Sequence, residues 1–226
     1  MLNIPEYKEY AGETKIALMD NSSLAFMHEL SQRSYPSDGI LSVYDLILIP
    51  KWVMEEIEDS TYRSTYVEQL QAQGYPIRWI DETKYGAFVN DEDVNLYYIV
   101  EAAVSRVSEL MRFLRRKVKT EDLIDLPSAE EWMNRLYDEW PIHGRTLSTG
   151  RTLKKNAGEI SLTILAEIFA WYHDGVDSLT IYTQDTDAHE FQTNIPAFIQ
   201  NGNQMKFIVL VFQIVDGTPV IGIFTC

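Results

Sequence analysis

Short apolar runs alternate along this chain with longer segments in which apolar positions recur at helical spacing. Runs of this kind, rich in Val, Ile and aromatic residues, are typical of buried strands. They lie at residues 15–19, 46–49, 77–80, 179–183 and 207–215. Strands that alternate with helices predict an α/β fold, in which helices flank a twisted and mainly parallel sheet. We expect 15–19 to be central, and 218–224 to pair antiparallel with 207–215 through the Asp216-Gly217 turn.

The segments between these runs predict helices. Asn21-Ser22-Ser23 can cap a helix that begins after the first strand, and Pro50 is well placed as the first residue of another. Residues 82–156 contain long helical segments and no Gly/Ser linker or internal repeat. The expected helices cover residues 21–32, 50–71, 94–118, 128–140, 157–173 and 186–200.

Composition excludes several classes of protein. The 226 residues carry a formal net charge of −15, which argues against a protein that coats nucleic acid with its whole surface. Cys226 is the one cysteine, so an intrachain disulfide and a Cys-based zinc site are both excluded. The longest purely apolar run, 207–212, is far shorter than the roughly 20 residues of a membrane helix. Because the N-terminus also lacks a signal-peptide pattern, we expect a cytoplasmic protein without a membrane partner.

Carboxylates stand at the ends of several predicted elements, where the functional sites of parallel sheets lie. Converging carboxylates repel one another unless a cation is bound, and oxygen ligands suit Mg²⁺ or Mn²⁺. A pair of such ions can activate water and stabilise phosphoryl transfer. The candidates are Asp20 after the first strand, Glu55 and Glu56 after Pro50, Glu159 in the helix at 157–173, and Asp185 and Asp187 after the strand at 179–183.

Each of these acids also has a purely structural explanation. Asp20 can cap the helix that it precedes, and Glu159 fits a capping box that begins at Asn156. Glu55 and Glu56 complement the positive end of a helix, and Asp185 and Asp187 suit a turn. Spacing alone therefore leaves metal binding and local capping both open.

Four strings in the chain resemble the motifs of PIN-domain nucleases, in the order that this family has them. Residues 16–24, IALMDNSSL, are similar to the family's opening strand, and 49–57, IPKWVMEEI, resemble its P-x-x-V-x-x-E-(I/L) motif. Residues 156–166, NAGEISLTILA, resemble a variant third motif with Glu in place of Asp. Residues 180–187, TIYTQDTD, resemble the T-x-D-x-D motif. The resemblance covers roughly residues 14–60 and 156–215.

This resemblance implies a PIN-like fold and Mg²⁺- or Mn²⁺-dependent phosphodiester hydrolysis, usually of RNA. It implies one domain over 1–226, in which 82–156 form a mostly helical insertion. The implied catalytic residues are Asp20, Glu56, Glu159 and Asp185; the same four with Asp187 are the implied metal ligands, and Asn21 and Thr183 are auxiliary.

Partners and role follow from the resemblance as well. VapC-like toxins and related ribonucleases imply an RNA substrate, and a role as the toxin of a toxin–antitoxin pair or in defence. An antitoxin or other protein partner and a homo-oligomer are compatible with it. The alternative is a catalytically inactive PIN-like module that binds protein. All four motif positions remain acidic here, which favours the enzyme.

Positive charge gathers in residues 143–155, a segment before Glu159 that we expect to form a loop. Arg145, Arg151, Lys154 and Lys155 fall within eleven residues that contain no acid. Arg and Lys hold phosphate backbones without reading their sequence, so we expect these four to bind substrate. The alternative is a solvated loop without a ligand.

Overall fold

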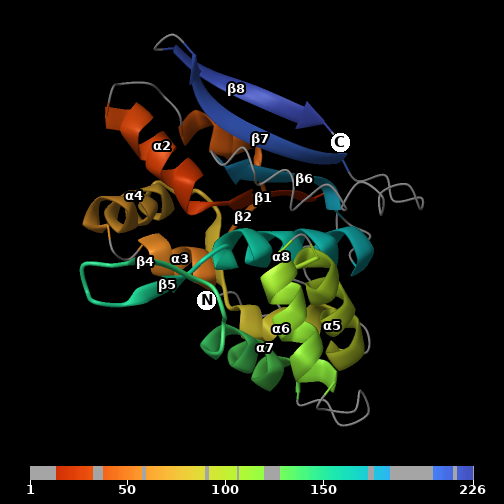
Figure 1. Cartoon of the computed structure of the whole chain (residues 1–226). Helices are drawn as coiled ribbons and strands as arrows, with labels where there is room; N and C mark the ends of the chain where they lie inside the picture. Colours follow the sequence, from red (N-terminus) through yellow and green to blue (C-terminus); the bar gives the residue numbers. More distant parts are fainter. Residues whose placement is uncertain are drawn as a thin grey trace.

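The structure is a computed structural model of the whole chain (Figure 1). It describes residues 14–32, 38–57, 60–89, 92–105, 107–119, 128–172, 176–183, 206–215 and 218–225. Asp185 and Asp187 lie outside these ranges, and so does the helix expected at 186–200.

A six-stranded sheet forms the centre of the molecule, in the order β3-β2-β1-β6-β7-β8. The strands are β1 (Thr14–Met19), β2 (Leu46–Pro50), β3 (Ile77–Ile80), β6 (Val176–Thr183), β7 (Lys206–Val215) and β8 (Thr218–Thr225). The first five are parallel and β8 is antiparallel to β7, which confirms the α/β prediction, the interior position of β1 and the C-terminal hairpin. Because β1 lies between β2 and β6, its Leu18 is level with both Leu48 and Ile181.

Helices cover the sheet, which explains why residues 16–19 of β1 and 46–49 of β2 are fully buried and apolar. The helix α8 (Ala157–Tyr172) packs against β1, β2 and β6, and α2 (Asn21–Gln32) packs against β6. The short α3 (Lys51–Ile57) follows β2 directly and contacts α8, α2 and α4 (Thr61–Ala72). The 3₁₀ helix η1 (Asp38–Val43) precedes β2.

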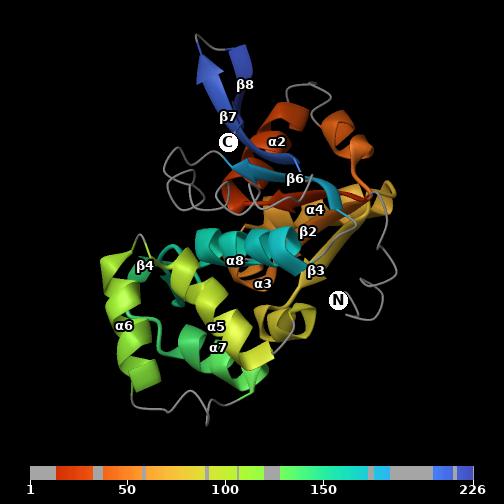
Figure 2. The same ribbon diagram turned by 90° about the vertical axis from the view of Figure 1, so that its right-hand side faces the viewer.

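The middle of the chain forms an arm on the far side of α8 from the sheet (Figure 2). It contains the 3₁₀ helix η2 (Glu82–Phe88), α5 (Glu92–Ala103), α6 (Ser108–Lys119), α7 (Ala129–Asp138) and a hairpin of β4 (His143–Thr146) and β5 (Thr152–Lys154). The buried apolar residues of its helices belong to the same core cluster as the sheet, whereas Leu147 and Leu153 of the hairpin do not. None of the helices in the described ranges combines the length and the apolar character that a membrane crossing requires.

Three expectations about local structure were wrong. The helix expected at 50–71 is divided, because the Ser60 hydroxyl accepts the N–H of Arg63 and begins a new helix, α4. The helix expected at 94–118 is also divided, because tight turns through Ser105 and Val107 end α5 before α6 begins. The basic segment at 143–155 is an antiparallel hairpin rather than a loop, and its turn holds Gly150 at a φ of 85°.

Candidate active site

Asp20 lies where β1 ends, and its buried carboxylate caps α2. Oδ1 accepts the backbone N–H of Asn21 at 2.7 Å. Oδ2 accepts the hydroxyl of Ser22, and the hydroxyl of Thr183 at 3.2 Å from the end of β6. The capping role proposed for Asp20 is therefore observed. Burial nevertheless raises the pKa of Asp20, because desolvation outweighs the hydrogen bonds that favour its charged form.

Glu56 lies beside Asp20, because β1 and β2 are neighbours and α3 begins where β2 ends. The side-chain amide of Asn21 donates to Glu56 Oε2 at 3.1 Å. The pKa of Glu56 is raised, first by burial and then by the negative charge of Asp20. Asn21 thus links two carboxylates that repel each other at the carboxyl edge of the sheet.

The first turn of α8 approaches Glu56 through Gly158, which has no side chain. A Cβ at Gly158 would lie 3.3 Å from Val53 Cγ2 and 3.5 Å from Glu56 Oε1. Glu159 is the next residue and is half-buried. No three His, Cys, Asp or Glu side chains within the described ranges are grouped so that they could hold a metal ion. Of the five predicted ligands, the structure brings Asp20 and Glu56 together and places Glu159 on the adjoining turn.

Two arginines complete the surroundings of Glu56. Arg63 on α4 donates from Nη1 to Asn21 Oδ1, and so it reaches the residue that links the two acids. The charges of Arg145 on β4 and of Arg63 both act to lower the pKa of Glu56, against the larger effect of burial. Arg145 was among the predicted substrate-binding residues. Arg63 was missed, because a single cation on a helix carries no local signal in the sequence.

Arg151 and Lys154, which were also predicted to bind substrate, contact the protein itself. Arg151 forms an ion pair with Glu55, whose carboxylate also accepts the hydroxyl of Tyr137. Lys154 Nζ donates to the carbonyl of Asp138 at 3.2 Å and lies 5.5 Å from the centre of the Tyr137 ring. These contacts hold the hairpin against α3 and α7. Lys155 has an exposed side chain.

A second buried carboxyl, Glu82 at the start of η2, joins the two helices that carry Glu56 and Glu159. Its Oε1 accepts the backbone N–H of Trp52 in α3 at 2.9 Å and the hydroxyl of Ser161 in α8 at 2.7 Å. The side chain is fully buried, and burial raises its pKa to about 8. The sequence did not mark Glu82, because nothing in its local pattern distinguishes it from a solvated acid.

Comparisons of the chain with protein-family models, with curated proteins and with solved structures found no match.

The oxygen atoms around Asp20 and Glu56 are of the kind that a hard divalent cation prefers as ligands. Asp20, Glu56 and Thr183 offer only oxygen atoms, the ligands that Mg²⁺ and Mn²⁺ prefer. Burial and mutual repulsion disfavour two negative charges here, and a cation would relieve both effects. Asp20 and Glu56 are therefore the described residues that would contact a Mg²⁺ or Mn²⁺ ion, although no third His, Cys, Asp or Glu among the described residues completes the group.

Proposed function

We propose that this chain is a metal-dependent phosphodiesterase of PIN type that hydrolyses RNA. The observation that carries this proposal is the pairing of Asp20 with Glu56 through Asn21, where two neighbouring parallel strands end. A buried and a half-buried carboxylate with raised pKa values, beside arginines, form an arrangement that suits phosphate chemistry.

We assign the acidic residues to the cation and the basic residues to the phosphodiester. Asp20 and Glu56 would hold the cation, and Thr183 orients Asp20 through its hydroxyl. Arg145 and Arg63 attract the phosphodiester and oppose the negative charge that grows in the transition state. When bound, Mg²⁺ or Mn²⁺ would activate water and polarise the phosphate.

Two conservative variants test the proposal. Asp20→Asn and Glu56→Gln remove charge with little change in volume, so each should abolish Mn²⁺-dependent cleavage of a single-stranded RNA. Each should also weaken Mn²⁺ binding, measured by calorimetry. Both should raise the melting temperature in chelator, because repulsion between the two acids falls. Glu68→Gln, on the exposed surface of α4, is the matched control. Full Mn²⁺-dependent activity in Asp20→Asn would reduce Asp20 to a helix cap.

The second candidate is a catalytically inactive PIN-like module that binds protein. It is favoured by one observation: both oxygens of the Asp20 carboxylate already accept hydrogen bonds that cap α2. A wild-type chain that neither binds Mn²⁺ nor cleaves RNA would support this candidate. An active chain that a bound protein silences would instead support the toxin of a toxin–antitoxin pair.

A further inference from the structure

The helix α6 carries a concentration of positive charge that is unusual for this chain. Five cations and no acid fall within residues 112–119, although the whole chain has a net charge of −15. The apolar residues of α6 face inward, since Leu110, Phe113 and Leu114 belong to the buried core. The exposed face of the helix is therefore strongly basic. Its described cations are Arg112, Arg115 and Arg116.

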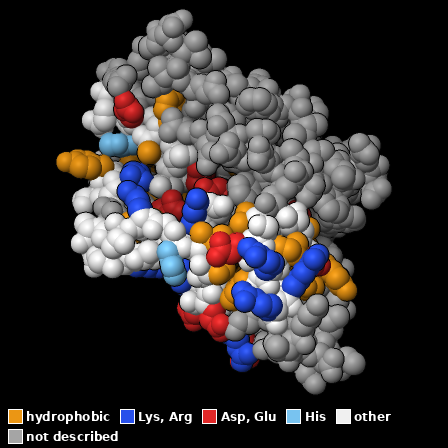
Figure 3. All heavy atoms as spheres, viewed as in Figure 1, with side chains coloured by type: hydrophobic (Ala, Val, Ile, Leu, Met, Phe, Trp, Pro, Cys, Tyr) orange, Lys and Arg blue, Asp and Glu red, His pale blue; other side chains and the backbone are white. Residues whose placement is uncertain are grey.

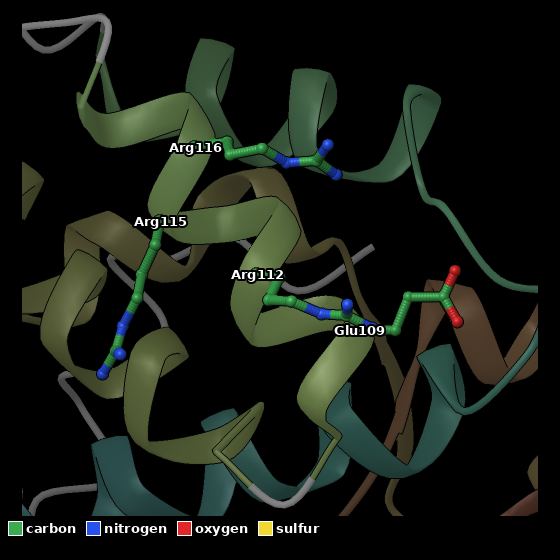
Figure 4. A pocket seen from close by; sticks show the side chains of 4 residues that line it. All are labelled: Glu109, Arg112, Arg115 and Arg116. Carbon is green, nitrogen blue, oxygen red and sulfur yellow. The ribbon is translucent and has the colours of Figure 1, made fainter.

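These arginines line a hollow of about 470 Å³ together with Glu109. Figure 4 shows Arg112 and Arg116, one helical turn apart, extending to the same side of α6. The carboxylate of Glu109 lies farther along that side, and Arg115 points the other way. Arg115 pairs with Glu101 of α5 at 3.2 Å and so fastens α6 to its neighbour. Arg112 and Arg116 thus extend together on one side of α6, while Arg115, which also lines the hollow, is held by Glu101.

A hydrogen bond within α6 orients the guanidinium of Arg112. Its Nε donates to the carbonyl of Ser108 at 3.3 Å, which limits rotation of the group. The two terminal nitrogens can then offer the parallel donors that match two phosphate oxygens. Side chains that are already oriented lose less conformational freedom on binding. Arg112 therefore suits phosphate better than a mobile surface cation would.

Helix α4, which borders the candidate active site through Arg63, and α6 are both visible on one face of the molecule. Figure 3 shows Lys and Arg side chains on that face both over α4 and over α6. α4 contributes Arg63, which contacts Asn21 at the site, and beside it Tyr62, which is 76% exposed. An exposed aromatic next to basic residues is a typical stacking platform for the bases of a single strand. This combination favours single-stranded nucleic acid over an acidic protein as the ligand of the face.

We infer that Arg112 and Arg116 bind the phosphate backbone of a single-stranded RNA, at nucleotides away from those held beside Asp20 and Glu56. This inference rests on the proposed function for the identity of the ligand. It adds a second contact region on α6, which only an RNA long enough to reach it can use. Strands confined to the site should bind without help from α6.

The test measures binding in chelator, so that no metal-dependent cleavage occurs. The double variant Arg112→Gln/Arg116→Gln and the wild type are titrated with single-stranded oligouridines of about 20 and about four nucleotides across a salt series. For the longer strand we expect roughly tenfold weaker binding and a salt slope lower by about 1.4, which corresponds to two lost phosphate contacts. For the shorter strand we expect no change. Arg115→Gln removes a charge from the same helix and should have a much smaller effect.

Each outcome separates this inference from the proposed function. Equal affinities and slopes for the double variant and the wild type with the longer strand would overturn the inference, even if the chain hydrolyses RNA. A wild-type chain that binds neither strand would overturn it too, and would turn attention to an acidic protein as the ligand of α6. Length-dependent binding through α6 without hydrolysis under any metal would support the inference while the nuclease proposal fails.

Discussion

The side-chain amide of Asn21 donates to Glu56 Oε2 at 3.1 Å, while the backbone N–H of Asn21 donates to Asp20 at 2.7 Å. One residue therefore stabilises both carboxylates of the candidate site. Arg63 completes the arrangement by donating to the carbonyl oxygen of the same amide. An amide can accept a hydrogen bond from Arg63 through its oxygen and donate one to Glu56 through its nitrogen. A carboxylate at the same position could only accept.

Asn21→Asp should make the stability of the protein depend on divalent cations. The change places a third negative charge against Asp20 and Glu56 and removes the amide donor to Glu56. We expect a melting temperature several degrees lower in chelator, and substantial recovery in millimolar Mn²⁺. Asn134→Asp, at an exposed position of α7, adds the same charge away from the site and is the control. An equal loss of stability in chelator and in Mn²⁺ would show that no cation binds near Asn21.

Gly158→Ala should impair activity more than stability. The new methyl group would lie 3.3 Å from Val53 Cγ2 and 3.5 Å from Glu56 Oε1, so α3 and α8 must separate slightly. A shift of a few tenths of an ångström at Glu56 should lower kcat at least severalfold. Gly144→Ala is a matched control, because its Cβ would meet Leu153 at ordinary contact distances of 3.5 Å and more. Wild-type kcat in Gly158→Ala would show that the position of Glu56 is not critical.

The sequence predicted those parts of the fold that depend on local pattern. Buried strands read as apolar runs, and Asp216-Gly217 marked the hairpin of β7 and β8. Capping predictions were correct where the side chain acts on its own helix, as Asp20 does when it accepts the N–H of Asn21. The pairing of Asp20 with Glu56 was also accessible, because the end of each parallel strand lies on one edge of the sheet.

The partners that Glu55, Arg145 and Arg151 find in distant segments were beyond prediction from the sequence. Glu55 and Glu56 are adjacent in α3, yet helical geometry directs Glu55 to Tyr137 and Arg151 and directs Glu56 to Asn21. The four cations of the basic segment looked equivalent for the same reason. Only tertiary packing separates Arg145, near Glu56, from Arg151, which is paired with Glu55.

Arg151 and Arg145 should therefore respond differently to the same substitution. Arg151→Gln leaves the nearly buried carboxylate of Glu55 without its ion pair, so the free energy of unfolding should fall by about 1–3 kcal/mol. Arg145→Gln removes an exposed side chain, so it should leave stability unchanged but weaken RNA binding at low salt. Thermal melting and a binding titration on both variants measure this contrast. Weaker RNA binding with unchanged stability in Arg151→Gln would instead show that Arg151 binds substrate.

Glu82 makes the free energy of unfolding depend on pH. It has an ordinary pKa of 4.5 and a pKa of about 8 in the folded state, where burial disfavours its charge. Between these values the folded state keeps a proton that the unfolded chain has lost. The stabilising contribution is therefore full below pH 4.5 and is lost as the pH rises to about 8. Glu167 in α8 is also buried and has a pKa raised to about 8, so it acts in the same direction.

Glu82→Gln should remove this contribution while keeping the contact between α3 and α8. The amide oxygen can still accept hydrogen bonds from Trp52 and Ser161. The amide nitrogen would replace Oε2, which has no hydrogen-bond partner among the described residues, so no hydrogen bond is lost there. For the wild type, each of the two acids should lower the free energy of unfolding by roughly 1.4 kcal/mol per pH unit in this range. In Glu82→Gln, and likewise in Glu167→Gln, the free energy of unfolding should fall less steeply with pH by the contribution of one acid. In the double variant both contributions should be absent. Denaturant unfolding measured from pH 5 to pH 8 checks this. If Glu82→Gln kept the wild-type slope, Glu82 would be ionised at neutral pH, and the link between the two helices would be a charged one.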